Sequence, residues 1–152
     1  MSLIDGTIPA MERVYTTPLL DKLGIRPGMR VAIVGALEDD DEVPDAEGPF
    51  RTRLAGRTSD ITDGHPKPNT DIVLLAADST AELAPLARLR PRIRPAGAIW
   101  VVSRKGKAST LRDVEVMAAA RDHRLVDNKV VSFSTRRTAI RLVIPVALRP
   151  KS

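Results

Sequence analysis

Residues 71–82 read Asp-Ile-Val-Leu-Leu-Ala-Ala-Asp-Ser-Thr-Ala-Glu, an unbroken apolar run followed by a polar helix start. An apolar run of this length is typical of a strand that is buried on both faces, as in a parallel sheet. Ser79 and Glu82 have the spacing of a capping box, which predicts that a helix begins directly after the strand. A strand that leads into a helix indicates an α/β fold.

The neighbouring segments repeat this pattern in both directions along the chain. Residues 30–36 and 97–103 are further apolar runs between turn residues, so each predicts another buried strand. Thr110 and Asp113 predict the start of a second helix, whose apolar side chains recur at helical spacing. Strands that alternate with helices indicate a mostly parallel sheet between two helical layers.

The first and last segments add a short helix and a hairpin. Thr17 as N-cap, Pro18 and Gly24 delimit a short helix near the N-terminus. Residues 125–134 and 138–148 predict two final strands, and their short connection fits an antiparallel hairpin. The hairpin adds one antiparallel strand to the sheet.

Residues 37–70 differ from the rest of the chain. They lack helical periodicity and are rich in acidic residues, Pro and Gly, and only Phe50 to Ala55 alternate enough to predict a short strand. We therefore expect a long acidic loop inside a single α/β domain over residues 1–152, with three layers and a mostly parallel sheet. Residues 1–15 are expected to be flexible.

The composition excludes several classes of protein. The absence of cysteine among the 152 residues rules out a disulfide scaffold, a thiol nucleophile, an iron–sulfur site and a Cys-based zinc site. The N-terminus lacks the basic start and apolar stretch of a secretory signal. No apolar run approaches the ~18 residues that cross a membrane. We therefore expect a cytoplasmic protein with no membrane partner.

The net charge of +5 is unevenly distributed along the chain. Residues 1–75 carry 8 basic and 13 acidic groups, whereas residues 76–152 carry 16 basic and 6 acidic groups, densest in basic side chains over 88–107. A basic stripe neutralises phosphates, but nucleic-acid modules usually add aromatic platforms for stacking. The aromatic residue of this segment, Trp100, lies in a predicted buried strand, so we expect it in the core. Nucleic-acid binding is therefore kept only as an alternative to a solvated basic surface.

The order of the predicted elements resembles the class I S-adenosylmethionine-dependent methyltransferases, whose fold is a variant of the Rossmann sheet. Residues 94–97 look like that family's Pro-Gly turn before its fifth strand, and residues 23–31 look like its approach to the first strand. More specifically, the chain resembles a family of short bacterial proteins of unknown function that looks like a degenerate relative of these methyltransferases. The resemblance implies a Rossmann-like fold and brings no activity with it. The residues that carry this finer resemblance are 17–19, 22–25, 27–29, Trp100 and Lys105.

The half of the fold that binds the cofactor in this family looks eroded here. The family's cofactor loop needs several glycines because its backbone closely approaches S-adenosylmethionine, whereas Gly35 stands alone in this chain. The helix after that loop is not visible in the sequence pattern. The second strand, whose terminal acid binds the ribose hydroxyls, is weak, with Asp60 and Asp63 as candidate substitutes. We therefore expect no cofactor, or S-adenosylmethionine if the chain is an active methyltransferase.

Ligands of open α/β sheets bind beyond the carboxyl ends of the strands, which locates the candidate sites. The segments after the first two strong strands predict a cofactor-binding set of Gly35, Ala36, Asp78 and Ser79. The segment after the third strand predicts an anion-binding set of Arg104, Lys105 and Lys107. Ser79 also has a simpler explanation as a helix cap.

An acidic segment, residues 38–47, is expected to face these basic residues at the same edge. Carboxylates suit Mg²⁺ or Ca²⁺, but the consecutive Asp39, Asp40 and Asp41 lack the alternate spacing of a calcium-binding loop. A solvated acidic loop explains them better, so no metal site is assigned. No catalytic residue is assigned either, because no Gly-x-Ser-x-Gly motif accompanies the two histidines.

These observations favour a non-catalytic, methyltransferase-like binding or interaction domain with a small anionic ligand. An S-adenosylmethionine-dependent methyltransferase with an atypical cofactor loop is the first alternative. A nucleic-acid-binding protein that uses the basic C-terminal half is the second. The apolar final hairpin also predicts a homo-oligomer.

Overall fold

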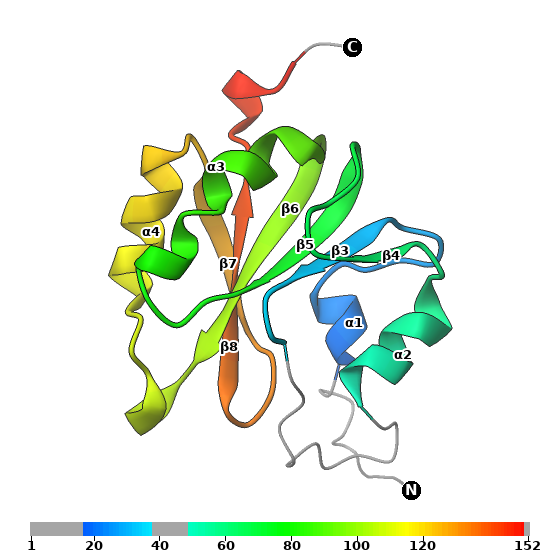
Figure 1. Ribbon diagram of the computed structural model, residues 1–152, viewed down its shortest axis with the longest axis horizontal. Helices are drawn as coiled ribbons and strands as arrows, with labels where there is room; N and C mark the ends of the chain where they lie inside the picture. The colour runs from blue at the N-terminus through cyan, green and yellow to red at the C-terminus, as the bar shows by residue number, and fades with distance from the viewer. Residues whose placement is uncertain (1–16, 38–48, 151–152) are drawn as a thin grey trace, which may run out of the picture.

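The computed structural model describes residues 17–37 and 49–150, which form one six-stranded sheet with helices on both faces (Figure 1). The strand order is β4-β3-β5-β6-β8-β7. The pairs β3–β4, β3–β5 and β5–β6 are parallel, and β8 is antiparallel to both β6 and β7. The predicted mostly parallel sheet with one antiparallel strand is therefore confirmed. The strands are β3 (Val31–Val34), β4 (Ile61–Asp63), β5 (Thr70–Ala76), β6 (Ile93–Arg104), β7 (Val126–Ser132) and β8 (Arg137–Val143).

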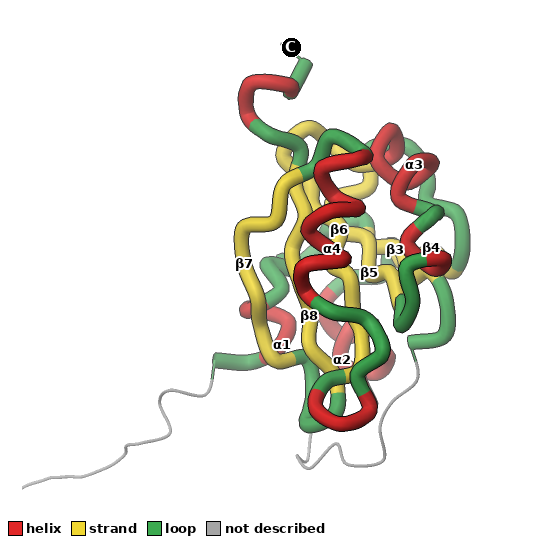
Figure 2. Tube along the Cα trace, turned by 90° about the vertical axis from the view of Figure 1, so that its left-hand side faces the viewer, coloured by secondary structure: helices red, strands yellow, loops and turns green. Residues whose placement is uncertain are grey.

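Two hydrophobic cores lie on the two faces of the sheet. Helices α3 (Leu86–Leu89) and α4 (Asp113–Asp122) cover one face, and α1 (Leu19–Lys22) and α2 (Phe50–Arg57) cover the other. Successive side chains of β5 alternate between the two cores, which explains why its sequence is apolar throughout. The expected three layers are confirmed. Figure 2, which views the outer edge of the sheet, shows β7 as the outer strand with α4 beside it.

Trp100 connects the middle of the sheet to the first helix. Its side chain is fully buried on β6, and its Nε1 donates a hydrogen bond to the carbonyl oxygen of Leu23 at 3.1 Å. The predicted core role of Trp100 is confirmed. Gly24, with φ of +75°, ends α1 as predicted, but the N-cap is Pro18, and Thr17 does not cap the helix.

Residues 50–57 correct one prediction, because the expected strand over Phe50 to Ala55 is helix α2. Phe50 and Leu54 are both buried against the sheet. Their spacing of four residues fits a strand, where side chains repeat every two residues, and equally one turn of a helix. The stretch 37–70 is therefore not one continuous loop, since α2 and the three-residue β4 lie within it. Residues 38–48 and 1–16 lie outside the described residues.

The single helix predicted after β5 is two short helical segments in the structure. Ser79 Oγ accepts the Glu82 backbone N–H at 3.3 Å, as a cap does, but the helix divides into a 3₁₀ turn at Ala81–Leu83 and the short α3. Pro85 lies between the two pieces and has no N–H for a continuous helix.

The C-terminal elements begin or end a few residues away from the predicted positions. Helix α4 begins at Asp113, where the Glu115 side chain accepts the Arg112 backbone N–H at 2.9 Å. Strand β8 ends at Val143, and the chain turns at Pro145, which has no N–H for a strand ladder. Within the described residues, no helix is long and apolar enough to cross a membrane.

Candidate functional site

The carboxyl ends of β3, β5 and β6 meet at one edge of the sheet, where the segments that follow them enclose a hollow of about 470 Å³. This volume is within the range of small-molecule sites, ~300–1,000 Å³. We call this hollow the edge pocket. Its lining residues are Gly35, Ala36, Ala76, Asp78, Glu82, Arg104 and Arg137.

Asp78 holds this edge together. Its Oδ1 accepts the backbone N–H of Arg104 at 2.8 Å, and its carbonyl oxygen accepts the hydroxyl of Thr110 at 2.5 Å. Its own N–H donates to Glu82 Oε1 at 2.7 Å, and its Oδ2 lies 4.0 Å from Arg104 Nε. Asp78 therefore ties the end of β5 to the end of β6 and fixes Arg104 at the wall of the pocket.

Gly35 is required by packing between two strands. Its φ is +90°, which side chains rarely adopt, and an added Cβ would lie 3.2 Å from the Ala76 carbonyl oxygen and 3.3 Å from the Ala76 Cβ. The close approach of the end of β3 to the end of β5 thus explains the glycine without a ligand.

A second hollow of about 450 Å³ lies between the segment after β6 and the turn of the β7–β8 hairpin. We call it the basic hollow, because each of its charged lining residues in the described chain is a cation. The β6–β8 register places Arg104 directly opposite Arg137, which is 8% exposed. The lining residues are Arg104, Lys105, Ala108, Thr135, Arg136 and Arg137.

The predicted site residues are only partly brought together. Gly35, Ala36, Asp78 and Arg104 line the edge pocket, and Lys105 lines the basic hollow. Ser79 Oγ accepts the Glu82 N–H, but the N-cap of the following turn is Thr80. Lys107 lies in the 3₁₀ turn Gly106–Ala108, and neither Ser79 nor Lys107 lines either hollow.

Sequence reasoning missed Arg136 and Arg137. Their only signal is their place at the start of the last strand, after a short connection. The side-by-side pairing of β6 with β8 brings them to Arg104. The register of that pairing cannot be read from the pattern of apolar residues alone.

The two acids expected to replace the ribose-binding residue lie at opposite ends of β4. Asp60 precedes the strand and pairs with Arg30 Nε at 3.0 Å, so it is far from the carboxyl edge. Asp63 is the last residue of β4 and therefore lies at that edge, where Arg51 of α2 forms an ion pair with it. Asp63 has the position of the family's terminal acid, but its carboxylate is paired.

No group of three His, Cys, Asp or Glu side chains within the described ranges is arranged to hold a metal ion. Asp39, Asp40 and Asp41 lie outside the residues that the structure describes.

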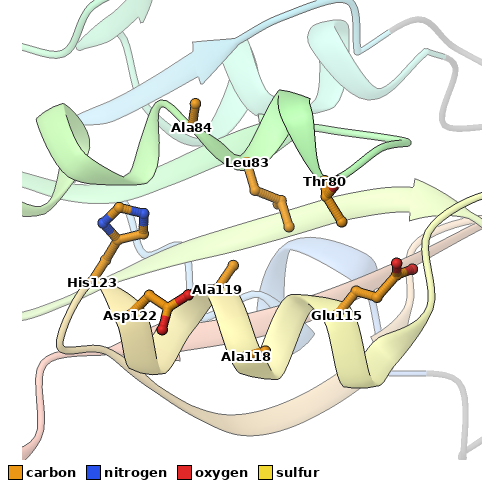
Figure 3. A pocket seen from close by; sticks show the side chains of 8 residues that line it. All are labelled: Thr80, Leu83, Ala84, Glu115, Ala118, Ala119, Asp122 and His123. Carbon is orange, nitrogen blue, oxygen red and sulfur yellow. The ribbon is translucent and has the colours of Figure 1, made fainter.

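A third hollow, of about 350 Å³, lies on the helical face rather than at the strand ends (Figure 3). Leu83 and Ala119 face each other across its middle, Glu115 lies toward one end, and Asp122 and His123 lie toward the other. The formally charged residues that line this hollow are Glu115 and Asp122, so the hollow does not suit an anionic ligand.

The solved structures that share this fold include the following two. The pyocyanin biosynthetic protein PhzM matches with a TM-score of 0.55 and 17% identity, over 82% of this chain and 52% of PhzM. A Thermoplasma acidophilum protein assigned as a methyltransferase matches with a TM-score of 0.50 and 10% identity, over 85% of this chain and 75% of that protein. No family model matches the chain, and no curated protein matches it in sequence.

These similarities establish a methyltransferase-like Rossmann fold for this chain. The chain spans about half the length of PhzM. The likeness gives no support to our expectation that the chain takes no cofactor, so S-adenosylmethionine remains a ligand to be tested.

Proposed function

We propose that the chain is a methyltransferase-like binding domain that holds a small anionic ligand against Arg104 and Arg137, which line both the edge pocket and the basic hollow, and that it transfers no methyl group itself. The observation that carries this proposal is the pair of arginines, Arg104 and Arg137, which lie opposite each other and line the pocket. An anion that contacts both guanidinium groups is attracted by two positive charges at once. Guanidinium groups also match the geometry of carboxylate and phosphate oxygens.

The other end of the edge supports a non-catalytic role. Gly35 is explained by strand packing, and Asp63 is paired with Arg51. A cofactor that needs the Asp63 carboxylate would have to compete with this ion pair. Between β3 and β5, the described residues form the short α2 and the three-residue β4.

One observation favours S-adenosylmethionine-dependent methyl transfer as the second candidate. Asp63 ends β4 at the carboxyl edge, beside β3, as the resemblance to methyltransferases requires. The finer resemblance to the short bacterial proteins and a cytoplasmic location are further proposals.

Calorimetric titration at constant ionic strength tests the leading proposal, with citrate and inorganic phosphate as probes. We expect both anions to bind, and Arg104→Gln to weaken binding at least tenfold. Lys107→Gln is the matched control, because it removes the same charge nearby but lines neither hollow. If neither anion binds the wild-type protein, the proposal is wrong.

Thermal unfolding with S-adenosylmethionine tests the second candidate. A ligand at ~100 times its dissociation constant adds ~2.7 kcal/mol to the free energy of unfolding, or roughly 5–10 °C for a chain of this size. We expect no such shift at millimolar cofactor. A shift of this size that Asp63→Asn abolishes would instead support the methyltransferase.

A further inference from the structure

The edge pocket and the basic hollow share a wall. Arg104 and Arg137 line both, so the two hollows, of about 470 and 450 Å³, adjoin on either side of the arginine pair. A ligand held by this pair therefore has room to extend to both sides.

The two hollows differ in charge. The basic hollow adds Lys105 and Arg136 to the arginine pair, whereas the edge pocket adds the carboxylates of Asp78 and Glu82. The combined lining carries four positive and two negative formal charges. The excess of two positive charges matches a phosphate monoester, which carries roughly −1.5 to −2 near pH 7.

One backbone contact joins the segments that carry Lys105 and Arg136, and one side-chain contact holds the Lys105 ammonium group. The Lys105 N–H donates to the Arg136 carbonyl oxygen at 2.9 Å, which joins the hairpin turn to the segment after β6. Lys105 Nζ donates to Ser132 Oγ at 2.7 Å. Because its side chain is already held, Lys105 loses less conformational entropy when it contacts a ligand.

The acidic side of the pocket suits hydroxyl donors. Asp78 Oδ1 and Glu82 Oε1 accept backbone N–H groups, Asp78 Oδ2 lies 4.0 Å from Arg104 Nε, and both residues line the pocket. A carboxylate oxygen accepts hydrogen bonds from hydroxyl or amino groups but repels a phosphate.

We propose that the two hollows form one bipartite site for a phosphate monoester of a polyhydroxylated group, such as a sugar phosphate or a nucleoside monophosphate. The phosphate lies in the basic hollow against Arg104, Arg137 and Arg136, and the hydroxyls donate to Asp78 and Glu82 in the edge pocket. This inference rests on the proposed function, because it uses the same arginine pair, and it adds the chemical class of the ligand.

Calorimetry at constant ionic strength tests the site with ribose 5-phosphate, adenosine 5′-monophosphate, inorganic phosphate, ribose and adenosine. We expect each monoester to bind at least tenfold more tightly than inorganic phosphate and than its own unphosphorylated form. Tighter binding of the nucleotide would identify a nucleoside monophosphate, and tighter binding of ribose 5-phosphate a sugar phosphate. Equal binding of phosphorylated and unphosphorylated forms would overturn the proposal.

Binding measurements on variants test whether the phosphate lies in the basic hollow and the hydroxyl groups lie in the edge pocket. Arg136→Gln, an exposed position that leaves its backbone contacts intact, is expected to weaken both monoesters and inorganic phosphate at least fivefold. Glu82→Gln keeps an acceptor oxygen for the Asp78 N–H and is expected to weaken the monoesters but not inorganic phosphate. Lys107→Gln is expected to change neither, and circular dichroism of each variant checks that it is folded.

The outcomes separate this inference from the proposed function. If citrate and phosphate bind and Arg104→Gln weakens them, but Arg136→Gln and Glu82→Gln have no effect on the monoesters, the bipartite site is wrong and the proposed function stands. If no anion binds the wild-type protein, both are wrong.

Discussion

A substitution at Gly35 can show whether this glycine is needed for packing or for ligand binding. Gly35→Ala places a Cβ at positive φ and 3.2 Å from the Ala76 carbonyl oxygen, so we expect it to lower the free energy of unfolding by about 1–3 kcal/mol. The measurement is urea unfolding followed by fluorescence of the single tryptophan.

Gly56 supplies the matched control, since it lies in α2 and an added Cβ there would meet nothing within 4 Å. Gly56→Ala is expected to raise the free energy of unfolding by up to about 1 kcal/mol. A Gly35→Ala protein of unchanged stability that no longer binds anions would contradict the packing role and assign Gly35 to the ligand.

Trp100 is the residue whose burial the sequence predicts best. Trp100→Phe removes the hydrogen bond to Leu23 and leaves a cavity in a fully buried site, so we expect a loss of about 2–4 kcal/mol in the free energy of unfolding. Far-UV circular dichroism follows the unfolding, because the variant has no tryptophan. Val114→Ala on α4, where the side chain is 59% exposed, is the control and should change stability little. A loss below ~0.5 kcal/mol in Trp100→Phe would contradict the packing described.

Among the elements, the starts of three neighbouring strands are joined through Asp71 on β5. Asp71 Oδ2 accepts the backbone N–H of Arg30 at 2.9 Å, and Oδ1 pairs with Arg94 Nε of β6 at 3.0 Å. Because the Asp71 side chain is only 19% exposed, we expect Asp71→Ala to lower the free energy of unfolding by about 1–3 kcal/mol. Asp63→Ala, which breaks a more exposed pair with Arg51, is expected to cost less than about 1 kcal/mol. Equal losses in urea unfolding would contradict this difference.

The outer strand β7 is the element on which the expected homo-oligomer depends. It has one neighbour, β8, and its Val130 is 53% exposed. An exposed strand edge invites pairing with another chain, and a lysine opposes it. We predict that Val130→Lys lowers self-association at least tenfold in sedimentation equilibrium, whereas Val114→Lys on α4 does not. A wild-type protein that is monomeric at about 100 µM would contradict the prediction.

Some of these elements could be predicted from the sequence and others could not. The buried strands β3, β5 and β6 and the C-terminal hairpin were predictable, because continuous or alternating apolar runs report burial directly. Helix α2 was not, because Phe50 and Leu54 fit both periods. The basic hollow was not predictable either, since it depends on the pairing that brings Arg137 opposite Arg104. Local pattern therefore gives the elements that line the edge pocket, while the partners across the sheet come from the tertiary structure.

For the whole molecule, the basic segment of residues 88–107 is not one surface patch. Strand β6 runs through it, so Arg94 and Arg104 lie near the opposite ends of one strand. Only the C-terminal part of this segment lies at the carboxyl edge, because Arg88 to Arg94 lie before or at the opposite end of β6. Arg94 is also paired with Asp71.

Because the basic residues lie at two separate ends of β6, we predict weak binding to nucleic acid, with an affinity that changes little with salt concentration. A site that contacts one or two phosphates gives a slope of log affinity against log salt no steeper than roughly −2, because the slope is ~−0.9 per phosphate neutralised. We expect a 16-base-pair duplex to bind with a dissociation constant weaker than about 10⁻⁴ M at physiological salt, measured by fluorescence anisotropy. The double variants Arg88→Gln/Arg92→Gln and Lys105→Gln/Arg136→Gln remove equal charge from the two ends of β6. If the basic residues formed one continuous stripe, the slope of log affinity against log salt would be steeper than about −4, and both double variants would reduce it. If the two ends are separate, no more than one of the double variants will lower the affinity for the duplex.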